Sequence, residues 1–152
     1  MKHRIRAAAI IVKGDSVLLV RHKFPDSDPW VPPGGGVEDS ESVYDCAKRE
    51  TYEETGLTVE LGKILYLREF IEPSRAVHQF EIFIFATSFT GEPTLTNNSP
   101  DDPDFKYIKD VKFVSKKDME GLLIYPEELK DKFWRDMAAG KLETQYLGQK
   151  FG

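Results

Sequence analysis

The chain has 152 residues, of which 40% are hydrophobic and 31% are charged, with a formal net charge of −5. This composition excludes a disordered chain, and the length predicts one globular domain over residues 1–152 with a sizeable core. The acidic balance argues against a nucleic-acid-binding or anionic-membrane-binding surface, and no apolar run approaches the ~20 residues of a transmembrane helix.

Two predicted strands open the chain. Residues 7–12 and 17–21 are apolar runs that flank the turn signal Gly14-Asp15, and together they predict a hairpin. The basic residues before the first run give it a faint likeness to a signal peptide. Lys13 and the turn that follows cut the apolar run short, and no small-residue cleavage site comes after it, so a strand is the better interpretation.

A helix is predicted from about Ser40 to Thr55, because this stretch contains neither Pro nor Gly. Asp39 or Ser40 is placed to cap its start, and Gly56 stands where a left-handed residue ends a helix. On a helical wheel, the core-facing stripe is apolar in its first half and acidic in its second. This stripe contains Val43, Cys46, Ala47, Glu50, Glu53, Glu54 and Leu57. The opposite face contains Asp45, Lys48, Tyr52 and Thr55.

Strands and helices alternate through the rest of the chain, which favours a sheet covered by helices. The segment that leads into the first helix, from Pro25 to Gly36, is rich in Pro and Gly and is predicted as a loop. Strands are predicted at residues 57–67, 79–89 and 107–114, a loop at 90–104, a short helix from Ser115 to Leu122 and a final helix from Pro126 to near Gly140.

The acidic half of the first helix carries three carboxylates, Glu50, Glu53 and Glu54, within one turn. Like charges at this spacing repel, and burial of an unpaired carboxylate is costly. A divalent cation removes both penalties, because Mg²⁺ and Mn²⁺ prefer oxygen ligands. Arg49 can reach Asp45 and Glu53 at i−4 and i+4 and so hold one carboxylate in place. For three glutamates alone, a solvated acidic helix is the alternative interpretation.

The spacing of the polar residues is more specific than the helix alone. Gly35, Glu41 and the segment from Arg49 to Leu57 fit the pattern G-x5-E-x7-R-E-U-x-E-E-x-G-U, in which U is a bulky aliphatic residue. All seven fixed positions match, which chance would give at about one start position in 10⁸. The segment resembles the Nudix box, and residues 30–36 resemble the segment that precedes that box. Thr51 departs from the pattern at the first U, which is not one of the charged positions.

The Nudix resemblance implies an α+β fold of the α/β/α sandwich type, with a mixed β-sheet between helices and the box as a loop–helix–loop. It also implies that Glu50, Glu53 and Glu54 are the metal ligands. A backbone carbonyl near Gly34 or Gly35 joins them, and we assign Gly35. The expected cofactor is Mg²⁺ or Mn²⁺, with one to three ions.

The resemblance also implies catalytic roles, for which Glu53, Glu50 and Arg49 are the candidates. The metals neutralise a diphosphate, orient a water molecule and lower its pKa, so that hydroxide attacks phosphorus. The general base is either one of the box glutamates or an acidic residue of the 90–104 loop. We assign Glu41 a supporting electrostatic role at the start of the helix. The acidic residues of the loop are Glu92, Asp101, Asp102 and Asp104.

The Nudix resemblance implies hydrolysis of a diphosphate bond, an acid anhydride, in a nucleoside diphosphate linked to another moiety. A nucleoside triphosphate or deoxynucleoside triphosphate pyrophosphohydrolase and an ADP-ribose or nucleotide-sugar pyrophosphatase both remain open. Candidates for substrate contact are Arg68, Arg75 and Asp104. The expected partner is a small-molecule nucleotide, with no nucleic acid and no membrane. Dimers are common in this family, so a homodimer is a candidate assembly.

Two other function classes are compatible with the same fold. A non-catalytic nucleotide sensor would be expected to lose box carboxylates, whereas all are present here. An isoprenoid diphosphate isomerase needs a reactive cysteine, but Cys46 lies on the inner face of the helix, where it is expected to pack. Cys46 is the single cysteine, so an intramolecular disulfide is excluded and a reducing compartment, the cytoplasm, is expected.

Overall fold

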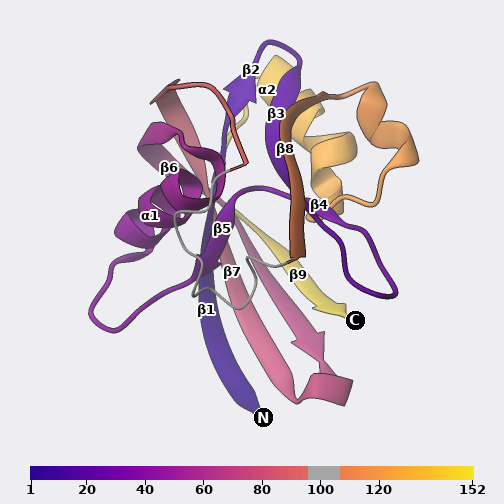
Figure 1. Ribbon diagram of the computed structural model, residues 1–152. Helices are drawn as coiled ribbons and strands as arrows, with labels where there is room; N and C mark the ends of the chain where they lie inside the picture. The colour runs from indigo at the N-terminus through magenta and orange to yellow at the C-terminus, as the bar shows by residue number, and fades with distance from the viewer. Residues whose placement is uncertain (96–106) are drawn as a thin grey trace.

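The computed structural model describes residues 1–95 and 107–152. Its strands form two sheets that lie between helical layers (Figure 1). The first sheet has the order β5-β1-β7-β6-β9, and the second contains β2, β3 and β4, with β8 paired to β3. The first sheet consists of β1 (Lys2–Ile10), β5 (Gly34–Gly36), β6 (Thr58–Glu72), β7 (Val77–Thr90) and β9 (Gln145–Phe151). The second consists of β2 (Val12–Lys13), β3 (Ser16–His22), β4 (Trp30–Val31) and β8 (Ile108–Ser115).

The first sheet is mixed, because β1 pairs with β7 in parallel and β6 with β9 in parallel, whereas the other pairs are antiparallel. Helix α1 (Val43–Thr55) covers one face of this sheet, and α2 (Lys132–Ala138) lies on the other side of the molecule (Figure 1). Cys46 and Ala47 of α1 pack in one cluster with Ala7 and Ile82, whereas Phe133 of α2 belongs to a separate core cluster. The predicted α+β fold, a mixed sheet between helices, is confirmed.

The N-terminal hairpin forms from different residues than predicted. The strands β2 and β3 make it, with Val12 paired to Val17 and Lys13 to Ser16. Strand β1 starts at Lys2 and pairs with β5 and β7 in the first sheet instead. The partner that decides the fate of residues 7–10 is therefore about seventy residues away, and no local pattern reveals it.

The strands β4, β5 and β9 were not predicted, and the C-terminal helices are shorter than predicted. The expected loop before α1 contains β5, which consists only of glycines, and β9 follows the last helix. The expected helix after Pro126 is split at Asp131, whose φ of −146° interrupts it. The other helical turns among the described residues are 3₁₀: η1 (Pro73–Arg75), η3 (Asp118–Gly121) and η4 (Glu127–Lys130). No helix in the described ranges is long and apolar enough to cross a membrane.

Candidate active site

Helix α1 begins later than the sequence suggests. Its N-cap is Ser42, whose side chain accepts a hydrogen bond from the Asp45 backbone N–H at 3.0 Å. The prediction of Asp39 or Ser40 as the cap is wrong, because Ser40 has a φ of 65° and belongs to the turn before the helix. Gly56 ends the helix as predicted, in the left-handed conformation with a φ of 78°.

Removal of the Ser42 cap is expected to destabilise the protein without inactivating it. Ser42→Ala leaves an N–H of the first helical turn without its acceptor, which costs about 1 kcal/mol. Ser40→Ala is the matched control, because Ser40 makes no capping bond to the helix in the described structure. Thermal or urea unfolding of both variants measures the difference. Equal stabilities would contradict the cap assignment.

The three box glutamates differ in burial. Glu50 and Glu54 are 4% and 5% exposed, whereas the side chain of Glu53 is 20% exposed. The carboxylate of Glu54 accepts a hydrogen bond from the Gly34 backbone N–H at 2.9 Å. A Cβ added at Gly35 would lie 2.5 and 2.7 Å from the two carboxylate oxygens of Glu50. The carboxylates therefore lie directly against the glycine strand β5, and a side chain at residue 35 would displace the Glu50 carboxylate.

One residue of the predicted outer face is buried instead. Thr55 is fully buried, as is Thr51, the residue that departs from the box pattern. The Thr55 hydroxyl donates to the Thr51 carbonyl at 2.7 Å and accepts from the Leu57 N–H at 3.2 Å. With both roles of the hydroxyl satisfied, a threonine is tolerated in the core at the end of the helix.

Arg49 gathers the acidic side chains of the box. Its guanidinium donates to Glu41 at 2.7 and 3.0 Å, to Glu50 at 2.9 Å and to Glu53 at 3.2 Å. It also donates to the Gly36 carbonyl at 3.3 Å. One arginine thus fixes two of the predicted metal ligands and ties them to the glycine strand.

The partners of Arg49 correct the sequence prediction in part. The pairing with Glu53 is confirmed, but Asp45 forms no ion pair with Arg49 among the described residues and is exposed. Glu41 takes that place from the loop before the helix, where it also accepts from the Glu38 N–H at 3.1 Å. The hydrogen bonds from Arg49 hold the pKa of Glu41 below its usual value. Glu41 is therefore placed to position Arg49.

Cys46 is placed for packing. It is fully buried, and its thiol lies 3.4 Å from the Gly35 carbonyl, to which it donates a weak hydrogen bond. Burial raises the pKa of this thiol to about 12. The thiolate, which is the nucleophilic form, is therefore scarce at neutral pH.

We expect Cys46 to be inert in the native protein. At pH 8 the thiol stays protonated and occluded, so a thiol reagent should modify it only after unfolding. Absorbance of the released chromophore with and without denaturant measures this. Cys46→Ala should keep the activity of the wild type. Rapid native-state labelling or loss of turnover in that variant would contradict the packing role.

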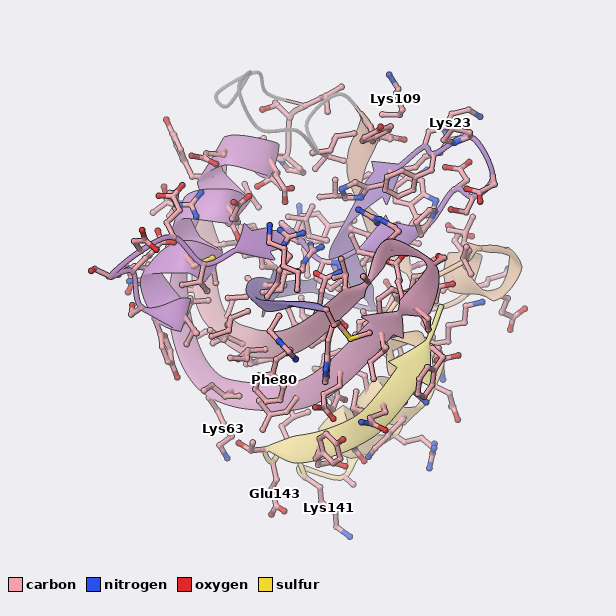
Figure 2. The ribbon with its side chains drawn as sticks, turned by 90° about the horizontal axis from the view of Figure 1, so that it is seen from below. Lys23, Lys63, Phe80, Lys109, Lys141 and Glu143 are labelled. Atoms are coloured by element: carbon pink, nitrogen blue, oxygen red, sulfur yellow. The ribbon has the colours of Figure 1, made fainter. Side chains whose placement is uncertain are left out.

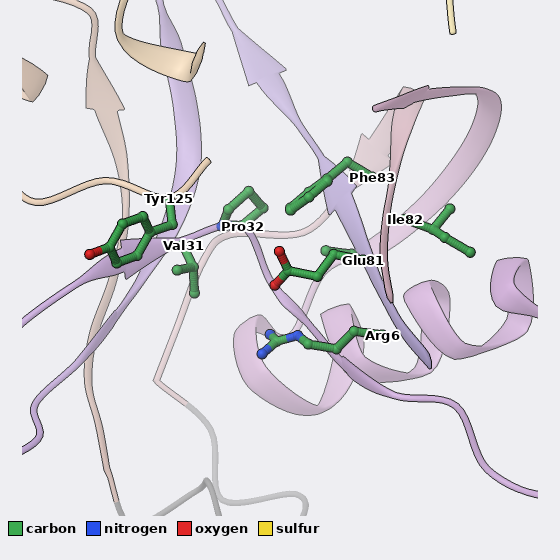
Figure 3. Close-up of a pocket in the computed structure, with 8 residues that line it drawn as sticks. Arg6, Val31, Pro32, Glu81, Ile82, Phe83 and Tyr125 are labelled. Atoms are coloured by element: carbon green, nitrogen blue, oxygen red, sulfur yellow. The ribbon is translucent and has the colours of Figure 1, made fainter. Parts of the chain in front are cut away.

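A cleft of about 660 Å³ lies beside the box. Its floor is formed by side chains of β1, β7 and β6, and its opposite wall by residues 22–31 with Tyr107 and Tyr125. Arg6 of the floor donates to the Gly34 carbonyl at 3.2 Å, which joins the cleft to the glycine strand. Figure 3 shows a smaller pocket of about 30 Å³, which shares Arg6, Val31, Glu81 and Tyr125 with this cleft; the Arg6 side chain there extends toward Val31.

The predicted substrate residues are distributed unevenly around the cleft. Arg68 lies in the cleft floor and is 3% exposed, whereas Arg75 lines the cleft from η1 and its side chain is 67% exposed. Asp104 lies outside the described residues, as do Asp101 and Asp102 of the same loop. Glu92 is exposed and does not line the cleft.

Sequence reasoning missed two cationic residues of the cleft, Arg4 and Arg6. Both line it from β1, where side chains alternate between the two faces of the sheet. The signal was present as a period of two, Arg4, Arg6, Ala8, interleaved with the apolar residues Ile5 and Ala7. It was missed because the predicted strand was started at Ala7, so the basic residues before it were not assigned to a face of the sheet.

Three aromatic side chains form one wall of the cleft. His22 stacks on Phe24 with ring centroids 5.9 Å apart, and Phe24 lies 4.9 Å from Tyr107. A bond from the Lys23 N–H to the Tyr107 carbonyl at 2.7 Å brings the two segments together. Figure 2 shows Lys23 and Lys109 on this same rim of the molecule. The wall offers planar surfaces on which a flat ring can stack.

The loop that carries this wall is pinned at its base. Arg21 donates to both carboxylate oxygens of Asp28, at 2.8 and 2.6 Å, and the His22 N–H donates to the Pro29 carbonyl at 2.9 Å. A two-pronged arginine–carboxylate contact fixes direction as well as distance. The position of Phe24 in the cleft is thus set by the loop ends.

Comparison with known proteins identifies the family. The NUDIX domain family matches residues 2–137. The chain is 43% identical over 68 residues to diphosphoinositol polyphosphate phosphohydrolase 2 of Rattus norvegicus, which covers 42% of this chain and only 37% of that relative. A MutT Nudix hydrolase structure from Burkholderia pseudomallei is 25% identical, with a TM-score of 0.70 over 86% of this chain and 96% of that one.

A second solved structure shares the fold. It is an ADP-ribose pyrophosphatase from Streptococcus suis, 23% identical with a TM-score of 0.58, and the match covers 98% of each chain. The complete box, its contacts with the glycine strand and the match over residues 2–137 agree with one another. This chain belongs to the Nudix hydrolase family.

Proposed function

We propose that this chain hydrolyses a diphosphate bond in a nucleoside diphosphate linked to another moiety, with Mg²⁺ or Mn²⁺ as cofactor. The observation that carries the proposal is the set of box carboxylates, packed against a glycine strand at the edge of a cationic cleft. Glu50 and Glu54 contact that strand directly, and Arg49 draws Glu50 and Glu53 together. A single domain carries all of these groups.

The donor set fits a hard divalent cation. Glu50, Glu53 and Glu54, with the Gly35 carbonyl, would hold it through oxygen atoms, which Mg²⁺ and Mn²⁺ prefer. Among the described residues, side chains alone form no ready three-ligand cluster, and the Arg49 guanidinium lies among these acids. The glycine opposite Glu50 leaves the close approach that a backbone carbonyl ligand needs.

When bound, the ion supplies positive charge and lowers the pKa of a water molecule. The protein supplies position. Arg49 orients Glu50 and Glu53, and Glu41 orients Arg49 in turn. Of the candidate bases, we favour Glu53 as the group that takes the proton of the water, because it is the most exposed of the three glutamates. Arg6, on the cleft side, offers its guanidinium to the phosphates.

Two classes of substrate are candidates for this site. The cleft has the size and the aromatic wall for a nucleotide, which covers nucleoside triphosphates and ADP-ribose-like compounds. The relatives at 43% identity are named as hydrolases of diphosphoinositol polyphosphates, which makes such compounds the second candidate. A nucleotide sensor without turnover is the alternative for the fold.

Buried, reduced Cys46 fits a reducing compartment such as the cytoplasm.

The proposal is tested by a screen of diphosphate compounds with Mg²⁺, with EDTA as the control. The panel contains nucleoside triphosphates, ADP-ribose, dinucleoside polyphosphates, nucleotide sugars and a diphosphoinositol pentakisphosphate, and products are identified by ³¹P NMR. We expect at least one nucleoside compound of the panel to be hydrolysed at the P–O–P bridge of its diphosphate when Mg²⁺ is present, and not in EDTA. Absence of turnover across the panel would favour the sensor and defeat the proposal.

A further inference from the structure

The charged residues of the cleft are ordered from the box outward. Arg4 and Arg6 of β1 come first: Arg6 donates to the Gly34 carbonyl, and a Cβ added at Gly36 would lie 3.0 Å from the Arg4 guanidinium. In the described part of the chain, neither arginine has a carboxylate within 4 Å. The cleft beside the glycine strand is therefore positively charged.

The next strand reverses this charge. Glu81 of β7 is paired in register with Arg6, and its carboxylate forms an ion pair with Arg68 of β6 at 2.5 Å. Arg68 is 3% exposed and lies between two aromatic rings, with its guanidinium 5.4 Å from Phe70 and 5.5 Å from Tyr125. Enclosed in this way, Arg68 is suited to hold Glu81 rather than to bind a phosphate.

Glu81 itself faces the substrate space. Its side chain is 13% exposed and lines the cleft. Figure 3 shows the Glu81 carboxylate and the Arg6 guanidinium, from adjacent strands, pointing the same way in the small pocket where they and Tyr125 also adjoin the cleft. The carboxylate of Glu81 therefore stands beside the arginine that the proposed function assigns to the phosphates.

The register of the sheet sets the distances along this row. Gly36 pairs with Arg6, Arg6 with Glu81, and Glu81 with Arg68, on four successive strands. Adjacent strands lie about 4.8 Å apart, so Glu81 stands about 10 Å from the glycine strand. A substrate whose diphosphate lies at the box and at Arg6 presents its next chemical group to Glu81.

We propose that Glu81 recognises that next group. Its carboxylate accepts hydrogen bonds from neutral donors, which are sugar hydroxyls or base amino groups, and it repels a phosphate at the same position. This inference rests on the proposed function and adds the substrate class that the cleft admits. Diphosphates joined to a nucleoside fit, because the nucleoside beyond the phosphates is uncharged and rich in donors. Diphosphates on a ring that carries further phosphates are rejected, because one of those phosphates would meet the Glu81 carboxylate.

The charge balance of the whole cleft agrees with this selection. Of its remaining charged residues, Arg75 is paired with Glu72 at 3.4 Å, and Asp26 adds a further carboxylate. Beyond Arg4 and Arg6, each arginine of the cleft therefore has a carboxylate partner. Such a cleft neutralises the charge of one diphosphate but offers little to a polyphosphorylated ring.

Equilibrium binding in EDTA tests the inference separately from turnover. The probes are adenosine 5′-monophosphate, guanosine 5′-monophosphate and inositol hexakisphosphate, titrated calorimetrically into the wild type, Glu81→Gln and Glu60→Gln. Glu60 is the matched control, because it is an exposed glutamate on β6, away from the cleft lining. In Glu81→Gln we expect nucleotide binding about tenfold weaker and inositol hexakisphosphate binding about tenfold tighter. Glu60→Gln should change neither by more than about twofold.

Opposite shifts for the two ligand classes distinguish recognition from damage to the fold. A structural defect from the loss of the Arg68 partner would weaken both, and unchanged or parallel shifts would overturn the inference. If Glu81→Gln is unstable, Glu81→Asp keeps the charge and must still reject inositol hexakisphosphate as the wild type does. Failure of the proposed function would appear instead as absent Mg²⁺-dependent hydrolysis, whatever the binding result.

Two further probes show whether the group that donates to Glu81 belongs to the sugar or to the base. The 2′,3′-dideoxy form of adenosine 5′-monophosphate lacks the sugar hydroxyls, and purine riboside 5′-monophosphate lacks the base amino group. If Glu81 accepts from the sugar, the effect of Glu81→Gln disappears with the dideoxy probe. If it accepts from the base, the effect disappears with the purine probe. Persistence of the full effect with both would contradict a neutral donor as its partner.

Discussion

Glu53→Gln is expected to lower kcat for diphosphate hydrolysis on the order of 10³-fold and to leave the fold intact. Glu53 is the most exposed box glutamate, and its carboxylate accepts from Arg49 at 3.2 Å. Glutamine has the same shape and can still accept that bond, so stability is preserved. It cannot supply the negative charge that a metal ligand or a base requires. Steady-state kinetics and thermal unfolding measure the two effects.

Glu60→Gln is the matched control for this substitution, because it removes an exposed carboxylate of β6 outside the site. It should keep the activity of the wild type. Glu54→Gln extends the test to a buried ligand, since the amide oxygen can still accept from the Gly34 N–H. Both Glu53→Gln and Glu54→Gln should abolish turnover. Wild-type turnover in both would defeat the assignment of these glutamates to the metal site.

Gly35→Ala is expected to damage both stability and activity. The added methyl group would lie 2.5 Å from a carboxylate oxygen of Glu50, in a region where α1 packs on β5. Either the Glu50 carboxylate must turn away from its place beside the strand, or the helix and the glycine strand must separate. Overpacking of this kind costs about 1–3 kcal/mol. A displacement of a catalytic group by about 1 Å costs on the order of 10²-fold in rate, so kcat/KM should fall by about that factor.

Gly121→Ala is the control for Gly35→Ala, since no atom lies within 4 Å of the position its Cβ would take. It should retain wild-type activity, and its stability should change little. Urea unfolding and kcat/KM for the best substrate of the screen compare the two variants. If Gly35→Ala were as stable and as active as Gly121→Ala, the close contact between Glu50 and the glycine strand would contribute to neither stability nor activity.

The helix of the box was predictable because its information is local. The spacing of Glu50, Glu53 and Glu54 placed them on the inner face, and Gly56 marked the end of the helix. The start was missed because three candidate capping residues follow one another closely. Only the backbone shows that Ser40 is left-handed and that Ser42 accepts the capping bond.

The strands were harder to predict where their partners are distant or their composition is uninformative. Strand β5 is three glycines, which carry no alternation and read as a loop. Strand β1 pairs with β7, far along the chain, and its pairing brings Arg6 to Glu81. The cleft depends on this register. The sequence shows each of its charged residues but not that strand pairing brings Arg6, Glu81 and Arg68 side by side.

The ion pairs also divide into those that local sequence predicts and those that depend on residues from distant segments. Arg49 to Glu53 follows from helix geometry and was predicted, whereas Arg49 to Glu41 crosses from the helix to a loop and was not. Arg68 was chosen as a substrate contact for its charge. The structure places it in the cleft floor, buried and paired with Glu81, and from this we infer that it positions Glu81. Charge in a sequence indicates what a side chain can do, and only packing decides which role it takes.

The central claim, that the box carboxylates hold a divalent cation, is tested most directly by Mn²⁺ binding. Electron paramagnetic resonance of free Mn²⁺, recorded during titration of the protein, reports the bound fraction without reference to any substrate. The account predicts saturable binding by the wild type and by Glu60→Gln, and binding at least about tenfold weaker in Glu53→Gln. Equal Mn²⁺ affinity in all three proteins would contradict it.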